Sequence, residues 1–183
     1  HEATTSIKDG QMITVDATNG IVYDGVLEDV VKTAAPQEQA VVASEYIPVT
    51  GTKVYMNLGD PDLAEKYGVL PCDGIGLMRE EFIWTTFIHE HPLHLIETGR
   101  SDFAVNTLAE GMRKVCQALA PRQVVVRLSD FKSSEYRDLK GGDKYEPHES
   151  SALLGWRGAS RYYDPKYTPA FKLELEAIKK VRN

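Results

Sequence analysis

Residues 124–132 have the sequence Val124-Val125-Val126-Arg127-Leu128-Ser129-Asp130-Phe131-Lys132, and this stretch decides the fold. It begins with three β-branched residues, and an apolar run of this kind predicts a fully buried strand of a parallel sheet. Arg127 stands where that strand should end, and a polar loop follows. Because α/β folds bind their ligands at the carboxyl ends of parallel strands, we expect Arg127 to reach a ligand pocket.

Two further arginines occur in similar settings. Arg79 closes the stretch Asp73-Gly-Ile-Gly-Leu-Met-Arg79, which contains a second short apolar strand, and Arg157 lies in Leu154-Gly-Trp-Arg157-Gly158. A guanidinium group is a planar fork that matches phosphate oxygens and stays charged at any working pH. Arginines that converge from successive strand ends therefore predict a small anionic substrate, and we expect it to carry a phosphoryl group.

The residues alone leave structural alternatives open for these arginines. Arg79 could form a surface ion pair with Glu80 or Glu81, and Arg127 could pair with Asp130 at the end of its strand. Isolated surface pairs of this kind contribute little to stability.

Arg157 could either contact the anion or hold the loop beneath it, and we expect Arg137 and Arg161 to order loops. The stretch His89–His94 lacks the i, i+4 histidine pair of zinc proteases, because its fifth residue is Leu93 and Pro92 interrupts the helix. We expect a solvated helix–loop junction there.

The composition limits the classes of function. The chain has 183 residues, 42% of them hydrophobic, and a net charge of −6, which argues against a broad nucleic-acid surface. No run approaches the roughly 18 apolar residues of a membrane helix. Cys72 and Cys116 have no metal-site spacing, so we expect reduced thiols, a cytoplasmic protein, and neither nucleic acid nor membrane as a partner.

Patterns along the chain predict three regions. Residues 1–25 contain a β-hairpin around Asn19-Gly20, residues 26–50 are expected to be a linker, and residues 51–183 alternate strands with helices. This alternation predicts an α/β fold with a parallel sheet. A complete (β/α)₈ barrel needs about 250 residues, so a barrel here would be partial, with about its first three strands.

Within residues 51–183 we expect four helices, one further short helical segment and three strands. The expected helices cover residues 60–68, 80–89, 102–119 and 167–182, with a short segment that starts at Pro92. The expected strands cover residues 53–58, 75–77 and 124–128, and residues 130–165 are expected to be rich in loops. In the last helix we expect four large apolar residues to face inward: Phe171, Leu175, Ile178 and Val181.

Several of these stretches resemble one known family. Asp73–Ile83 resembles the Asp-Gly-(Ile/Val)-Gly-Leu-x-Arg-x-Glu-Phe segment of the phosphoenolpyruvate-utilising enzymes. The segment from Arg127 to Tyr136, the triplet Tyr145-Glu-Pro and the stretch from Leu154 to Arg161 are similar to further segments of that family. Residues 8–23 resemble the end of its swivelling phosphohistidine domain.

The resemblance implies a fold and an activity. A longer polypeptide would use ATP to phosphorylate a histidine on a mobile domain, and that histidine would carry the phosphoryl group to pyruvate in a (β/α)₈ barrel. The overall reaction would convert ATP, pyruvate and water to AMP, phosphoenolpyruvate and phosphate. The resemblance implies that Arg79, Arg127 and Arg157 bind the substrate.

The resemblance also implies what this stretch of chain lacks. The ligands of Mg²⁺ and an acid cysteine are expected beyond residue 183, and the ATP site and the carrier histidine upstream. No residue of this chain is therefore assigned a catalytic or metal-binding role, and we expect the chain alone to be inactive. The remaining domains of the same polypeptide and further copies in a homo-oligomer are the expected partners.

Two alternatives stay open, together with one departure from the family pattern. The parent could be a sister enzyme, pyruvate phosphate dikinase or the phosphotransferase-system enzyme I, or the chain could be a non-catalytic assembly or binding module.

The family usually has Asn-Pro-Met before Leu-Gly-x-Arg-Gly, whereas this chain has Ser150-Ser151-Ala152-Leu153 before Leu154-Gly155. The missing proline puts the preorganisation of the loop before Arg157 in question.

Overall fold

The computed structural model describes residues 6–17, 19–28, 49–149, 151 and 155–182. The chain divides into two compact units, residues 1–47 and residues 48–183, and each unit has its own sheet. Most of the expected linker lies outside the described residues, as does most of the segment in which the family's proline is missing.

The first unit contains the predicted hairpin. Strand β1 (Ile13–Asp16) pairs antiparallel with β2 (Ile21–Asp24). The carboxylate of Asp16 accepts a hydrogen bond from the backbone N–H of Asn19 at 3.0 Å, and Gly20 has a φ of +69° that glycine adopts without strain.

The second unit is built on a parallel sheet in the order β3-β4-β5, as the alternating pattern predicts. Its strands are β3 (Tyr55–Leu58), β4 (Gly74–Arg79) and β5 (Gln123–Arg127). The prediction that β5 is fully buried is wrong, because Val125 is 40% exposed. Side chains alternate between the two faces of a sheet, and Val124 and Val126 pack against the core whereas Val125 points to the opposite face.

Short helices connect the strands. The carboxylate of Asp60 accepts from the N–H of Asp62 at 2.9 Å, with Pro61 at the first helical position, which confirms the expected helix start. The elements up to the third strand are η1 (Pro61–Leu63), α3 (Ala64–Gly68), α4 (Glu81–Ile83), the π-helical turn η2 (Trp84–Ile88), α5 (Pro92–Glu97) and α6 (Ser101–Leu119).

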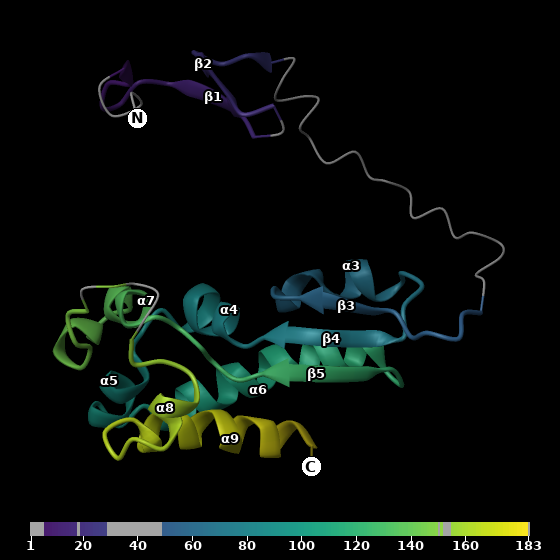
Figure 1. Cartoon of the computed structure of the whole chain (residues 1–183), viewed down its shortest axis with the longest axis vertical. Helices are drawn as coiled ribbons and strands as arrows, with labels where there is room; N and C mark the ends of the chain where they lie inside the picture. Colours follow the sequence, from purple (N-terminus) through teal and green to yellow (C-terminus); the bar gives the residue numbers. More distant parts are fainter. Residues whose placement is uncertain (1–5, 18, 29–48, 150, 152–154, 183) are drawn as a thin grey trace. The chain divides into compact units, whose positions relative to one another are not determined.

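Three helical segments follow β5 in the region that was expected to be rich in loops, and a long helix closes the unit. The three segments are α7 (Ser133–Asp138), η3 (Gly142–Lys144) and α8 (Ala159–Tyr162), and the long helix is α9 (Thr168–Arg182). Figure 1 shows α6 running along the sheet beside β4 and β5, with α9 packed against α6. No helix in the described part of the chain is both long and apolar enough to span a membrane.

The core lies between the sheet and these two long helices. One face of α6 is apolar, and its residues Leu108, Met112 and Val115 are fully buried. Each such side chain stabilises the fold by about 1.5–3 kcal/mol through burial.

The predicted inward face of α9 is wrong in part. Leu175 is 44% exposed, whereas the buried residues of this helix are Ala170, Leu173, Glu174 and Ala177. Small alanines bring α9 close to α6 at this face, so the spacing of the largest apolar residues does not indicate which side is buried.

Candidate phosphoryl-binding site

Two of the three predicted arginines lie side by side at the carboxyl edge of the sheet. Arg79 is the last residue of β4 and Arg127 is the last residue of β5, and the two are directly paired in the parallel register. The backbone N–H of Glu80 donates to the carbonyl oxygen of Arg127 at 3.3 Å, which extends the pairing by one residue. The alternation of strands and helices thus delivers both guanidinium groups to one edge, as parallel topology requires.

A single buried carboxylate stands between these two arginines. Oε1 of Glu81 accepts from Nη2 of Arg127 at 2.6 Å and from the backbone N–H of Asp130 at 3.2 Å, and Oε2 lies 3.9 Å from Nε of Arg79. The Glu81 side chain is 2% exposed, whereas those of Arg79 and Arg127 are 46% and 41% exposed. The carboxylate therefore holds Arg127 by a hydrogen bond and lies within ion-pair distance of Arg79, and both guanidinium groups remain partly exposed to an anion.

The third arginine joins the site through Asp130. Nε and Nη2 of Arg157 each donate to a different carboxylate oxygen of Asp130, both at 3.0 Å. These hydrogen bonds are the main cause of a lowered pKa of Asp130, and the charges of Arg127 and Arg79 lower it further. The carboxylate of Asp130 thus interacts electrostatically with all three guanidinium groups. The site contains these three positive charges and two carboxylates, those of Glu81 and Asp130.

The ring of Phe82 packs against Arg79, the most exposed of the three site arginines. The guanidinium carbon of Arg79 lies 5.1 Å from the ring centroid of Phe82, a cation–π geometry. The ring in turn approaches the backbone at Gly59 so closely that a Cβ atom there would lie 2.7 Å from it. The guanidinium group of Arg79 therefore has a cation–π contact with Phe82 and lies within ion-pair distance of Glu81.

Two buried acids beneath the arginines were not predicted from the sequence. Glu80 is fully buried, and neither of its carboxyl oxygens has a hydrogen-bond partner among the described residues. Burial raises its pKa well above the ordinary value, and the neighbouring carboxylates of Glu174 and Glu81 raise it further. The raised pKa favours the uncharged form of this carboxyl group.

The second of these acids, Glu174 on α9, accepts hydrogen bonds from the backbone N–H of Ser129 at 3.2 Å and from its hydroxyl. Burial raises the pKa of Glu174 to about 8. One pattern could have revealed it: Glu174 lies four residues after Ala170 and three before Ala177, on the small-residue face of the helix.

The expectation of a solvated junction at residues 89–94 is wrong at His91. This side chain is fully buried, its Nδ1 accepts from the N–H of Leu93 at 3.2 Å, and its Nε2 lies 2.8 Å from a carboxyl oxygen of Glu146. Because Nδ1 accepts a hydrogen bond, Nε2 carries a proton and donates to Glu146, and burial lowers the pKa of His91. The partner lies 55 residues further on, which local pattern cannot show.

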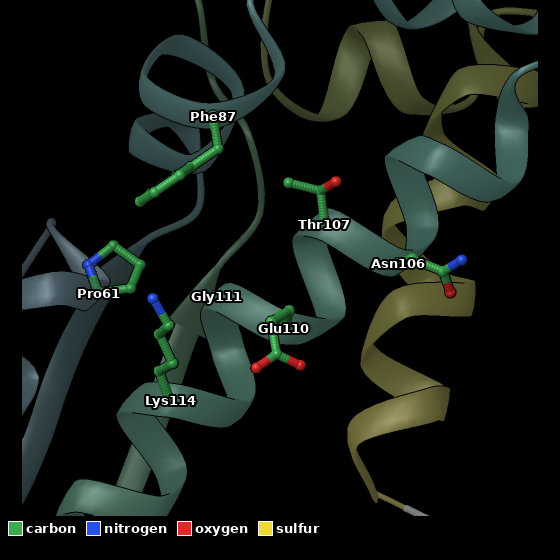
Figure 2. Close-up of a pocket in the computed structure, with 7 residues that line it drawn as sticks. All are labelled: Pro61, Phe87, Asn106, Thr107, Glu110, Gly111 and Lys114. Atoms are coloured by element: carbon green, nitrogen blue, oxygen red, sulfur yellow. The ribbon is translucent and has the colours of Figure 1, made fainter.

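A hollow of about 380 Å³ lies elsewhere, on the outer side of α6 (Figure 2). It is lined by Pro61, Phe87, Asn106, Thr107, Glu110, Gly111 and Lys114. Its charged groups already have partners, because Nζ of Lys114 donates to Asp62 at 2.7 Å and Glu110 accepts from Arg113 at 2.8 Å. None of the three site arginines lines this hollow. Because its charged groups are already paired with other side chains, the strand-end arginines are the better candidate site for an anion.

Comparison with known proteins identifies the class of this domain. Residues 33–183 match the model of the family described as PEP-utilising enzyme, PEP-binding domain, in which PEP is phosphoenolpyruvate. The match covers most of the chain, including both strand-end arginines and the loop that carries Arg157. The chain therefore belongs to the family of PEP-utilising enzymes.

Among its relatives, the chain is 56% identical to the probable phosphoenolpyruvate synthase of Staphylothermus marinus over 98% of its length. It is 53% identical to the phosphoenolpyruvate synthase of Aeropyrum pernix over 99%, and 39% identical to that of Escherichia coli over 100%. The chain spans 22%, 23% and 25% of the lengths of these three relatives.

Proposed function

We propose that this chain is the phosphoryl-binding part of a phosphoenolpyruvate synthase. The observation that carries the proposal is the pairing of Arg79 with Arg127 at one sheet edge, with Arg157 tied to the same acidic loop. Donors aimed at a transferring phosphoryl group stabilise the charge that develops there. The names of the relatives favour this enzyme over the two sister enzymes of the family.

In the proposed reaction, ATP, pyruvate and water become AMP, phosphoenolpyruvate and phosphate through a phosphohistidine. Arg79 and Arg127 would hold the phosphoryl oxygens with their exposed N–H groups, while Glu81 orients Arg127 through a hydrogen bond. Arg157 would add a third donor beside Asp130. Because guanidinium groups remain protonated, these residues would bind and orient the anion and leave proton transfer to other groups.

The finer architecture belongs to the same proposal. We place residues 1–25 at the end of a swivelling phosphohistidine domain, residues 26–50 in a linker, and residues 51–183 in the first three strands of a (β/α)₈ barrel. Among the described residues, no group of three or more His, Cys, Asp or Glu could hold a metal ion. As the resemblance to the family implies, the proposal assigns the residues that hold Mg²⁺ and ATP to other parts of a longer polypeptide, and it assigns no step to them.

Titration of the 183-residue chain with phosphoenolpyruvate, followed by ³¹P NMR, tests the proposal. Arg79→Gln and Arg127→Gln should each weaken binding on the order of tenfold or more, since each removes a charge-assisted hydrogen bond to the anion. Arg113→Gln on the outer face of α6 is the matched control and should bind as the unaltered chain does. Equal affinity for Arg127→Gln and the unaltered chain, or no binding by the latter at millimolar ligand, would contradict the proposal.

A further inference from the structure

Trp156, the residue before Arg157, is held at both of its backbone polar groups. The backbone N–H of Trp156 donates to a carboxylate oxygen of Glu149 at 2.7 Å. Its carbonyl oxygen accepts from Nε of Arg161 at 3.0 Å and from Nη2 at 2.7 Å. Charge-assisted bonds of this kind are roughly twice as strong as neutral ones. The backbone is therefore fixed immediately before the side chain that reaches Asp130.

Arg161 is itself held in one position. Its side chain is 1% exposed and donates two N–H groups to the carboxylate of Glu146, at 2.6 and 2.7 Å. Three aromatic rings, those of Tyr136, Trp156 and Tyr167, have centroids 4.3, 4.1 and 4.8 Å from its guanidinium carbon. A planar cation enclosed in this way is locked by packing as well as by hydrogen bonds.

Two glycines of the loop around Arg157 lie close to acidic side chains. A Cβ atom at Gly155 would lie 1.9 Å from Oε2 of Glu149, and one at Gly158 would lie 3.3 Å from Oδ1 of Asp130. Gly158 has a φ of +56°, which favours glycine. The backbone thus rests against Glu149 at one end and against the acidic partner of Arg157 at the other.

We propose that Arg161 and Glu149 are positioning residues for Arg157. They bind the N–H and the carbonyl oxygen of Trp156, and this clamp fixes the backbone from which the Arg157 side chain extends. The inference rests on the proposed function in one respect only, namely that the anion met by Arg157 is a phosphoryl group. A group held within about 0.5 Å of its working geometry binds without first losing conformational freedom.

The pKa of Asp130, measured by carboxyl ¹³C NMR on the 183-residue chain, reports the position of Arg157 without any ligand. Arg161→Lys keeps the charge but loses the fork, and should raise the pKa of Asp130 to the level seen in Arg157→Gln. The double variant should go no further. Nη1 of Arg137 lies 3.0 Å from Nδ1 of His148. Arg137→Lys is the matched control, and Asp130 in this variant should keep the wild-type pKa. A folded Arg161→Lys chain with the wild-type pKa of Asp130 would overturn the proposal.

A second variant covers the case in which Arg161→Lys does not fold. Glu149→Ala frees the N–H of Trp156 and the hydroxyl of Ser133, but it keeps the two hydrogen bonds from Arg161 to Glu146, so it should also raise the pKa of Asp130. If Asp130 in that variant titrates as in the wild type, the clamp does not position Arg157.

Titration of the same variants with phosphoenolpyruvate separates this proposal from the proposed function. Arg161→Lys should weaken binding on the order of tenfold, and should have no effect in the Arg157→Gln background. An equal loss in both backgrounds would mean a general structural role and would overturn the positioning proposal. If no variant binds, including the unaltered chain, while Asp130 still responds to Arg161→Lys, the proposed function fails and the positioning role stands.

Discussion

Glu174 makes the stability of this chain depend on pH in a direction opposite to that of an ordinary ion-paired acid. Its pKa is raised by burial from an ordinary value of 4.5 to about 8 in the folded state. Between these two pH values the folded chain holds a proton that the unfolded chain has lost. The favourable contribution is therefore fully present below pH 4.5 and is lost as the pH rises toward 8.

The change Glu174→Gln should reduce this fall in the free energy of unfolding between pH 5 and pH 8, as measured by urea denaturation at several pH values. The amide can still accept from the N–H of Ser129, so the fold should survive. Glu176→Gln, an exposed position on the same helix, is the matched control, and since it keeps Glu174 it should retain the wild-type slope. A Glu174→Gln chain with that same slope would show that Glu174 is not the group responsible.

Single residues also show why part of the site escaped prediction. Arg79 and Arg127 could be placed at strand ends because strand length and β-branched composition are local properties. Glu81 was expected only as a surface partner of Arg79, yet it is buried and bonds more closely to Arg127. His91 and Glu80 are buried by parts of the chain far away in sequence, and no local pattern carries that information.

At the scale of elements, the contact between β4 and β5 depends on Gly74. This residue has a φ of +145°, and a Cβ atom there would lie 2.2 Å from the carbonyl oxygen of Gln123 on the neighbouring strand. Gly74→Ala should therefore lower the free energy of unfolding by roughly 3 kcal/mol, through strain and steric overlap together.

Gly99→Ala is the matched control for this substitution. Gly99 also has a positive φ, +70°, but nothing lies within 4 Å of the added carbon. Gly99→Ala should lower the free energy of unfolding by only about 1 kcal/mol. Urea denaturation followed by circular dichroism measures both changes, and equal costs would show that the close approach to Gln123 is unimportant.

The elements differ in how far the sequence predicts them. Helix α6 was predicted to within one residue at its start, because its apolar face repeats over five turns and is packed as the pattern requires. The short helices α7, η3 and α8 were expected to be loop, since each is too brief to show a period and is held by tertiary bonds such as Arg161 to Glu146. The face of α9 was misassigned because its contact with α6 uses alanines.

At the scale of the whole molecule, the proposed function predicts that the 183-residue chain does not turn over substrate alone. With ATP and pyruvate it should release no AMP, because the proposal assigns the nucleotide site and the carrier histidine to other parts of a longer polypeptide. Chromatographic detection of AMP measures this. An Arg127→Gln chain prepared in parallel identifies contaminating activity, since such activity persists in both samples. Pyruvate-dependent AMP formation that the substitution abolishes would contradict the proposal.

The three parallel strands lie across the sheet in the same order in which they follow one another along the chain. Each newly made strand therefore finds its template already present in the strand that left the ribosome just before it. No later segment has to insert between strands that have already paired. Synthesis from the N-terminus can thus add one β/α unit at a time to a growing edge, and the arginine pair is complete as soon as β5 has docked.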